Sequence, residues 1–204
     1  METREKVYMS TFNQHGILEL AESFHDNGWN IVAEGNTFEQ INASSIPVMN
    51  LADLGGGHSA IAAGVSLPLQ GQKPIKRGRT SQVMNFSAVC IDMMPPKLIS
   101  NSGYTDEEKV EKFDFIRPEL LSLAASCGRI AVSQDSQRPI VAEWLSSGRP
   151  HEASVVATLA AVAVKEAAAY ISSRNALLTR VVEKRESVTG LEEDLRQGLK
   201  HTHY

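Results

Sequence analysis

The chain has few cysteines and no excess of basic charge, and each of these shortages excludes a class of protein. Two cysteines in 204 residues, Cys90 and Cys127, are too few for a disulfide scaffold. Both lie in apolar surroundings, which is typical of buried reduced thiols. A net charge of -4 argues against a general nucleic-acid binder, since such proteins are usually basic. We therefore expect a protein of a reducing compartment with no nucleic-acid partner.

Long hydrophobic runs are also missing. The longest uncharged apolar stretch, ASVVATLAAVAV, is about half the length that a membrane span needs. The opening METREKVYMS has no apolar core of the signal-peptide type. A hydrophobic content of 42% is enough for the core of a globular domain. We expect a soluble cytoplasmic protein with no membrane partner.

Motifs for metals and activated nucleophiles are absent as well. The sequence has no Cys/His spacing of a zinc site, no Walker-type loop and no Ser-His-Asp signature. The closing HTHY does not by itself indicate a metal, because histidines on a frayed end are more often without function. We therefore expect no metal and no cofactor.

Hydrophobic periodicity predicts an α/β domain. Apolar strand patterns alternate with helical patterns along the first part of the chain, and the alternation continues after an irregular segment at residues 54–85. Such alternation is typical of a parallel sheet with helices on its faces. The expected strands are 6–11, 29–34, 46–54, 84–94 and 129–133, and the expected helices include 15–27, 37–41, 117–126 and 138–148.

The C-terminal part is Ala-rich and is predicted to be helical from residue 150 onward. Its first half has apolar residues nearly all round, and such a helix must be covered. A domain this small does not easily cover all of Val155, Val156, Leu159 and Val162. We expect an α/β domain over residues 1–149, and a helical segment over 150–204 that packs on it or on a dimer partner. A homodimer is therefore predicted.

The turn AEGNT joins the strand at 29–34 to the following helix. Gly35 lets a ligand approach the backbone closely, and Thr37 can donate a hydroxyl or cap the helix. Backbone N–H groups at a helix N-terminus suit a phosphate. An ordinary capped turn is the alternative interpretation.

The irregular segment 54–85, which can hold a short helix at HSAIAAGV, contains two further candidates. Lys76, Arg77 and Arg79 cluster beside Thr80 and can clamp a phosphate or carboxylate, whereas the alternative is a solvated basic loop. His58 follows three glycines and can exchange protons near neutral pH. A histidine without a partner at motif spacing is more often incidental. A loop of this length in a compact domain is usually functional or mobile.

Four segments in order resemble a known family. They are VYMSTFNQHGILELAESFHDNGWNIVAEGNTFEQINASSIPVMNLADL, AVCIDMMPP, FDFIRPELLSLAASCGRIAVSQDSQRPIVAEWL and LAAVAVKEAAAYISSRNALL. This series is similar to the IMP cyclohydrolase domain of the bifunctional purine-biosynthesis enzyme, without a counterpart of its formyltransferase half. The resemblance implies a three-layer methylglyoxal synthase-like fold with a C-terminal helical extension, and a small-molecule nucleotide as the ligand.

Together with these patterns, the resemblance gives a list of candidate site residues. Gly35 and Thr37 match the family's phosphate turn, Ser10 matches a family serine, and Asp114 matches a family aspartate. The candidates for ligand binding are Ser10, Gly35, Asn36, Thr37, Lys76, Arg77, Arg79, Thr80 and Asp92. The candidates for catalysis are Asp114, Arg117 and His58.

Departures from the family pattern leave the function open. Glu34 puts a carboxylate where a substrate phosphate is expected, which is a repulsive pair. Met94 and Ser126 replace a tyrosine and a lysine, and proton-transfer groups are typically worth about 10²–10⁴-fold each.

Three hypotheses follow. The first is an enzyme for IMP cyclohydrolase-like ring closure of a formamido-imidazole-carboxamide ribonucleotide or a close analogue. The second is a non-catalytic module that binds a nucleotide or phosphate ligand. The third is an assembly protein that acts through the Ala-rich helix. The intact order of the segments favours the first two, and we place the enzyme first by a narrow margin.

Overall fold

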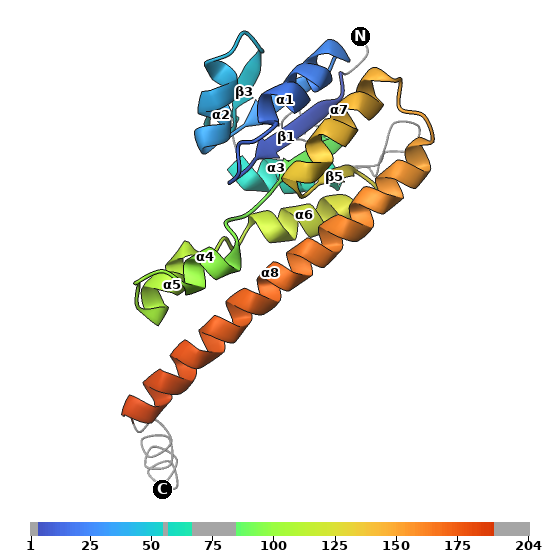
Figure 1. The fold of residues 1–204 in the computed structure, drawn as a ribbon. Helices are drawn as coiled ribbons and strands as arrows, with labels where there is room; N and C mark the ends of the chain where they lie inside the picture. Colours follow the sequence, from blue (N-terminus) through green and yellow to red (C-terminus); the bar gives the residue numbers. More distant parts are fainter. Residues whose placement is uncertain (1–3, 55–56, 67–84, 190–204) are drawn as a thin grey trace, which may run out of the picture. The chain divides into compact units, whose positions relative to one another are not determined.

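The computed structural model describes residues 4–54, 57–66 and 85–189 (Figure 1). These residues fall into two compact units. The first unit comprises Met1–Met94 and Asp114–Ala168, and the second comprises Pro95–Phe113 and Ala169–Tyr204. All the described site candidates named above lie in the first unit.

The first unit is built on a five-stranded sheet whose strands are all parallel (Figure 1). The strands lie in the order β3-β2-β1-β4-β5, so β1 is central. Met9 of β1 pairs with Ala33 of β2 on one side and with Cys90 of β4 on the other. The predicted parallel sheet is confirmed. The strands are β1 (Lys6–Ser10), β2 (Asn30–Ala33), β3 (Val48–Asn50), β4 (Ala88–Ile91) and β5 (Ile130–Val132).

Helices cover both faces of this sheet, because side chains on a strand alternate between its faces and both faces are apolar here. Val7 and Met9 pack in one core with α1 (Ile17–Asp26), α2 (Gly35–Asn42) and α7 (Arg138–Ser146). Tyr8 packs in the other core with α3 (Gly57–Val65) and α6 (Arg117–Ser126). Two short 3-10 turns, η1 (Leu51–Asp53) and η2 (Asp135–Gln137), follow β3 and β5. The predicted α/β architecture with helices on both faces is therefore confirmed.

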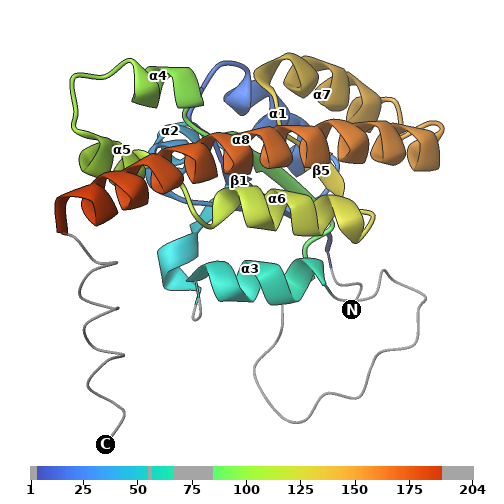
Figure 2. The ribbon, with the colours of Figure 1, turned by 90° about the horizontal axis from the view of Figure 1, so that it is seen from below.

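The long helix α8 (Glu152–Thr189) belongs to both units. Within the first unit it contributes Leu159 to one core, and Ala163 and Ala167 to the other. It runs between α7 and α6 beside β5 (Figure 2). The domain itself therefore covers part of the apolar surface that predicted a partner, since Val155 and Val156 are partly buried against the first core.

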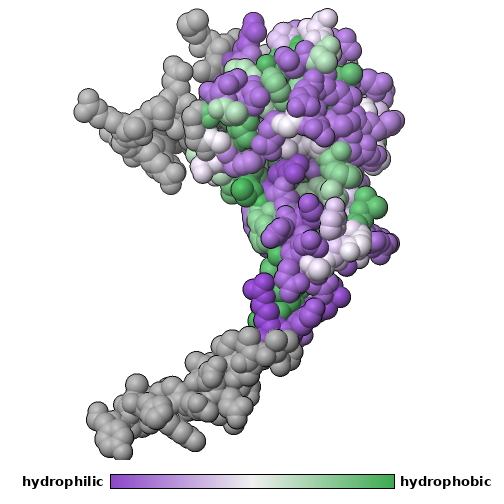
Figure 3. Space-filling model, turned by 90° about the vertical axis from the view of Figure 1, so that its left-hand side faces the viewer, coloured by the Kyte–Doolittle hydropathy of each residue, from purple (hydrophilic) through white to green (hydrophobic). Residues whose placement is uncertain are grey.

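The length and composition of Glu152–Arg185 within α8 would also allow it to cross a membrane. Only 22% of its apolar window is buried. A core helix of a soluble protein passes the same test, so one such helix is weak evidence for a span. On the face shown in Figure 3, hydrophobic side chains occur in separate groups among hydrophilic ones. The cytoplasmic localisation stays a prediction.

The second unit contains α4 (Pro96–Ser100), α5 (Asp106–Lys112) and the end of α8. Thr105 and Glu108 form a reciprocal capping box that fixes the start of α5. The rings of Phe113 and Tyr170 pack edge to face, with their centroids 5.3 Å apart. Apolar contacts and helix caps therefore order this unit.

Candidate functional site

The candidate site lies where the central strands of the sheet end. In open parallel sheets, ligands bind outside the carboxyl ends of the strands, near the point where the strand order reverses. Here the order reverses at β1, which has β2 on one side and β4 on the other. Ser10 ends β1, Glu34 follows β2 and Asp92 follows β4. The parallel register therefore places three polar side chains at one edge.

Glu34 is the centre of the first polar cluster. Its Oε1 accepts hydrogen bonds from the Tyr8 hydroxyl at 2.6 Å and the Ser10 hydroxyl at 2.8 Å. The same oxygen lies 3.1 Å from Nε2 of His58, which α3 brings in from the other side of the turn. Segments that are distant in the sequence thus meet on one carboxylate oxygen.

The surroundings of Glu34 favour its charged form. Burial raises the pKa of this carboxyl, but the hydrogen bonds from Tyr8, Ser10 and His58 outweigh burial and hold its pKa below the ordinary value. Burial, together with the neighbouring Glu34 carboxylate, raises the pKa of the Tyr8 phenol far above its ordinary value. The cluster is therefore an ionised carboxylate held by neutral O–H donors and by His58.

Asp114 and Arg117 extend this cluster from the start of α6. The Asp114 carboxylate accepts the backbone N–H groups of Ile116 and Arg117 at 2.8 Å each and forms an ion pair with the Arg117 guanidinium. Burial raises the pKa of Asp114, but these partners outweigh burial and lower it. Arg117 in turn donates to the Ser10 hydroxyl at 3.2 Å. A continuous chain of contacts thus runs from His58 through Glu34 and Ser10 to Arg117 and Asp114.

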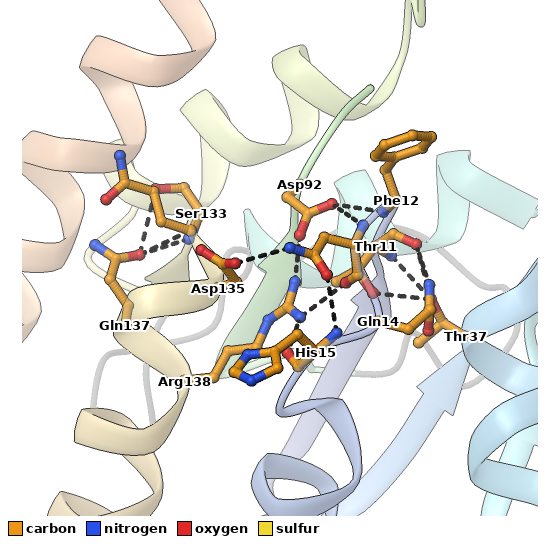
Figure 4. A network of polar contacts seen from close by, with 12 residues as sticks. Thr11, Phe12, Gln14, His15, Thr37, Asp92, Ser133, Asp135, Gln137 and Arg138 are labelled. Atoms are coloured by element: carbon orange, nitrogen blue, oxygen red, sulfur yellow. Dashed lines mark hydrogen bonds and ion pairs between the residues drawn. The ribbon is translucent and has the colours of Figure 1, made fainter. Parts of the chain in front are cut away.

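A second network fixes the segment that follows β1 (Figure 4). Asp92 accepts the backbone N–H groups of Phe12 at 2.5 Å and Asn13 at 3.0 Å, and it pairs with the buried guanidinium of Arg138. Arg138 also donates to the carbonyl oxygens of Asn13, at 2.8 Å, and His15. Burial raises the pKa of Asp92, although the two amides and Arg138 oppose this. These contacts hold the backbone next to Ser10 in one conformation.

The turn between β2 and α2 combines a structural side chain with exposed backbone. Thr37 is 1% exposed, and its hydroxyl accepts the Thr11 backbone N–H at 2.9 Å. Gly35 has a φ of 52°, a conformation that L side chains rarely adopt, and Asn36 is exposed. Thr37 therefore ties the turn to the end of β1, while Gly35 and Asn36 face outward.

The structure brings several sequence candidates together. Ser10, His58, Asp114 and Arg117 belong to the Glu34 cluster, and Asp92 and Thr37 belong to networks beside it. Lys76, Arg77, Arg79 and Thr80 lie outside the described residues. Among the residues that the structure describes, no group of three or more His, Cys, Asp or Glu side chains could hold a metal ion.

Sequence reasoning missed the parts played by Glu34, Tyr8 and Arg138. The sequence indicates Glu34 only as a departure that opposes phosphate, whereas in the structure Glu34 is the residue on which the cluster converges. A usable signal was present, because Tyr8 and Ser10 lie two residues apart at the end of the first predicted strand, and the carboxyl ends of parallel strands meet at the same edge of a sheet as the predicted turn. The sequence gives no signal for the role of Arg138, which is the first residue of an amphipathic helix.

The fold is of a known type. The structure titled "Crystal structure of ForH" superposes with a TM-score of 0.67, covering 86% of this chain and 99% of that one. The sequence identity is 18%, so this likeness shows the fold alone. The five-stranded parallel sheet with flanking helices and a long C-terminal helix is consistent with the methylglyoxal synthase-like fold.

Curated sequences related to the chain are distant. The bifunctional purine biosynthesis protein PurH of Deinococcus radiodurans is 23% identical over 132 residues, and that of Caldicellulosiruptor saccharolyticus is 26% identical over 133 residues. Each match covers 59% of this chain but only 26% of the PurH protein. A comparison with protein-family models found no match. The chain is thus similar to a PurH-type cyclohydrolase-like domain related to purine biosynthesis, and it spans about a quarter of the PurH proteins that it matches.

Proposed function

We propose that the first unit is an IMP cyclohydrolase-like domain that closes the ring of a formamido-imidazole-carboxamide ribonucleotide or a close analogue. The observation that carries this proposal is the chain of contacts from His58 through Glu34 and Ser10 to Arg117 at the reversal point of the sheet. The distant similarity to PurH supports it from the sequence side.

The reaction sets clear requirements for the site. The carboxamide nitrogen attacks the formyl carbon and forms a C–N bond, while the formyl oxygen gains a proton and becomes a hydroxyl. Loss of this hydroxyl with one nitrogen proton releases one water and completes the ring. The site must therefore supply a proton acceptor for the nitrogen, a positive group near the formyl oxygen and a proton donor for the leaving hydroxyl.

His58 and Arg117 can meet these requirements. When Nε2 of His58 donates to the ionised Glu34 carboxylate, Nδ1 carries the lone pair and can accept the nitrogen proton. The same ring can then pass that proton to the formyl oxygen, which makes the hydroxyl, and can transfer a second proton from the formamido nitrogen to this hydroxyl as it leaves as water. Arg117 is held by Asp114, and its guanidinium can stabilise negative charge that develops on the formyl oxygen.

The test is turnover by His58 variants. Purified wild type, His58→Gln and the control His25→Gln are incubated with the formylated ribonucleotide, and IMP is measured by chromatography. His25 is exposed on α1, so its substitution leaves the cluster intact. We expect His58→Gln to lower kcat by about 10²–10⁴-fold, as for loss of a general acid–base group, and His25→Gln to match wild type. Unchanged kcat in His58→Gln would remove His58 from the mechanism.

A binding module without catalysis is the second candidate, and the position of Ser126 favours it. This residue replaces the family lysine, and its hydroxyl donates to the carbonyl of Ser122 at 2.9 Å. It lies at the end of α6 opposite Arg117, roughly 13 Å along the helix at 1.5 Å per residue. Ser126 therefore supplies no replacement for the missing amine. Ligand binding in calorimetry without any turnover would select this candidate.

A further inference from the structure

The carboxylate of Glu34 uses its two oxygens unequally. All three of its partners, Tyr8, Ser10 and His58, contact Oε1. In the part of the chain that the structure describes, no hydrogen bond reaches Oε2. The Glu34 side chain is 24% exposed and that of His58 is 32% exposed, so the cluster is open to a ligand. One oxygen is thus fixed by the protein and the other is available as an acceptor.

The turn that carries Glu34 has the backbone of an anion-binding site, but the negative charge that lies there is the carboxylate of Glu34 itself. Gly35, with φ 52°, starts α2, and among the described residues no side chain caps the first amides of this helix. The hydroxyl of Ser10 and the ring of His58 would be natural partners for a bound phosphate, but both are engaged by Glu34. A phosphate placed here would meet a second negative charge at close range, which is unfavourable in a half-buried site.

We propose that the turn between β2 and α2 recognises a hydroxyl or amino group of the ligand through Oε2 of Glu34, and disfavours a phosphate at this position. The inference rests on the proposed function for the identity of the ligand, an imidazole-carboxamide riboside or its phosphate. An ionised acceptor forms strong hydrogen bonds with O–H and N–H donors. Glu34 therefore sets which end group of the ligand the site accepts.

The test compares two ligands and three proteins by calorimetric titration. The ligands are aminoimidazole-carboxamide riboside and its 5′-monophosphate, and inorganic phosphate is titrated separately. The proteins are wild type, Glu34→Thr and Glu39→Thr. Glu39 is exposed on the same helix, so its substitution removes the same charge without touching the cluster.

Wild type is expected to bind the riboside at least as tightly as the monophosphate. Glu34→Thr is expected to weaken riboside binding about tenfold, since a charge-assisted hydrogen bond is lost, and to shift the preference towards the monophosphate by a further factor of about ten. Glu39→Thr is expected to match wild type. A wild-type preference for the monophosphate that Glu34→Thr leaves unchanged would overturn the proposal.

Inorganic phosphate separates this proposal from the proposed function. If neither riboside nor monophosphate binds wild type, the proposed ligand class is contradicted. The proposal for the turn is then tested by the binding of inorganic phosphate alone. Tighter phosphate binding by Glu34→Thr than by wild type and Glu39→Thr then supports the proposal, and equal binding overturns it. Thermal unfolding checks that each variant is folded. Glu34→Gln, which keeps the side-chain shape without the charge, replaces Glu34→Thr in the same comparison if the latter does not fold.

Discussion

Arg138 is expected to be the most sensitive residue for the stability of the site. Its side chain is 1% exposed, and its guanidinium joins Asp92 to the carbonyl oxygens of Asn13 and His15 (Figure 4). Arg138→Met keeps the apolar length of the side chain but removes the charge and every donor. The segment after β1 then loses the group that ties it to α7.

The size of the effect follows from burial. Removing one partner of a buried ion pair costs about 3–5 kcal/mol, because the other charge stays buried without compensation. Asp92 is 14% exposed and keeps the amides of Phe12 and Asn13 as donors, which places the expected loss near the lower limit, at about 3 kcal/mol. Arg149 is a more exposed comparison at 30%: it pairs with Glu5 at 3.1 Å and with Glu152 at 3.5 Å, and its guanidinium lies over the ring of Trp29. Arg149→Met is expected to cost about 1 kcal/mol, as for a surface pair.

Urea unfolding followed by tryptophan fluorescence measures these losses. The chain has 2 tryptophans, Trp29 and Trp144, and both lie in the first unit, so the signal reports on the unit that holds the site. Adding Asp92→Asn to Arg138→Met is expected to recover part of the loss, because it removes the unpaired charge. Equal losses in Arg138→Met and Arg149→Met would show that burial of the Arg138 ion pair does not raise its contribution to stability.

Three further outcomes are expected. Thr37→Val should lower the free energy of unfolding, measured in urea, by about 2 kcal/mol, because the Thr11 amide loses its buried acceptor. Thr37→Ser keeps the hydroxyl and should lower it by about 1 kcal/mol. Equal losses in the two variants would show that the hydroxyl does not have this role. The folded-state pKa of Glu34 is lowered, so its stabilisation is present above its ordinary pKa of 4.5 and lost as the pH falls through the lower folded value. Wild type should therefore lose its stability advantage over Glu34→Gln in acid, and a difference independent of pH would contradict this. The homodimer remains a proposal. Val164 on α8 is 42% exposed, so light scattering should give a dimer mass for wild type and a monomer mass for Val164→Glu. A monomer mass for wild type would disprove the homodimer.

The elements of the first unit could be predicted because their sequence patterns are local. The helix predicted at 117–126 is α6 to the residue, and the strand predicted at 84–94 contains β4. The third predicted strand, 46–54, is shorter than expected because the chain turns into η1 at Leu51. Helix α4 was not predicted because Pro95 and Pro96 read as a stop, although proline suits the first turn of a helix.

The candidate site was only partly predictable because its contacts depend on the register between strands. Glu34 lies 26 residues from Tyr8 and 24 from Ser10 and from His58. Tyr8 and Ser10 meet Glu34 because Met9 pairs with Ala33 in parallel register, and α3 brings in His58; no local pattern specifies either arrangement. The ion pair between Asp92 and Arg138 joins residues 46 positions apart, and no local sequence pattern predicts it either.

The Glu34 cluster is proposed to serve ring closure on an imidazole carboxamide. The most direct measurement is the rate of ring closure by wild-type protein, with the formamido-imidazole-carboxamide ribonucleotide and the corresponding riboside as separate substrates and chromatography of the products. We expect IMP from the first substrate or inosine from the second, with loss of either product in His58→Gln. Absence of both products at concentrations where calorimetry shows the ligands bound would contradict it.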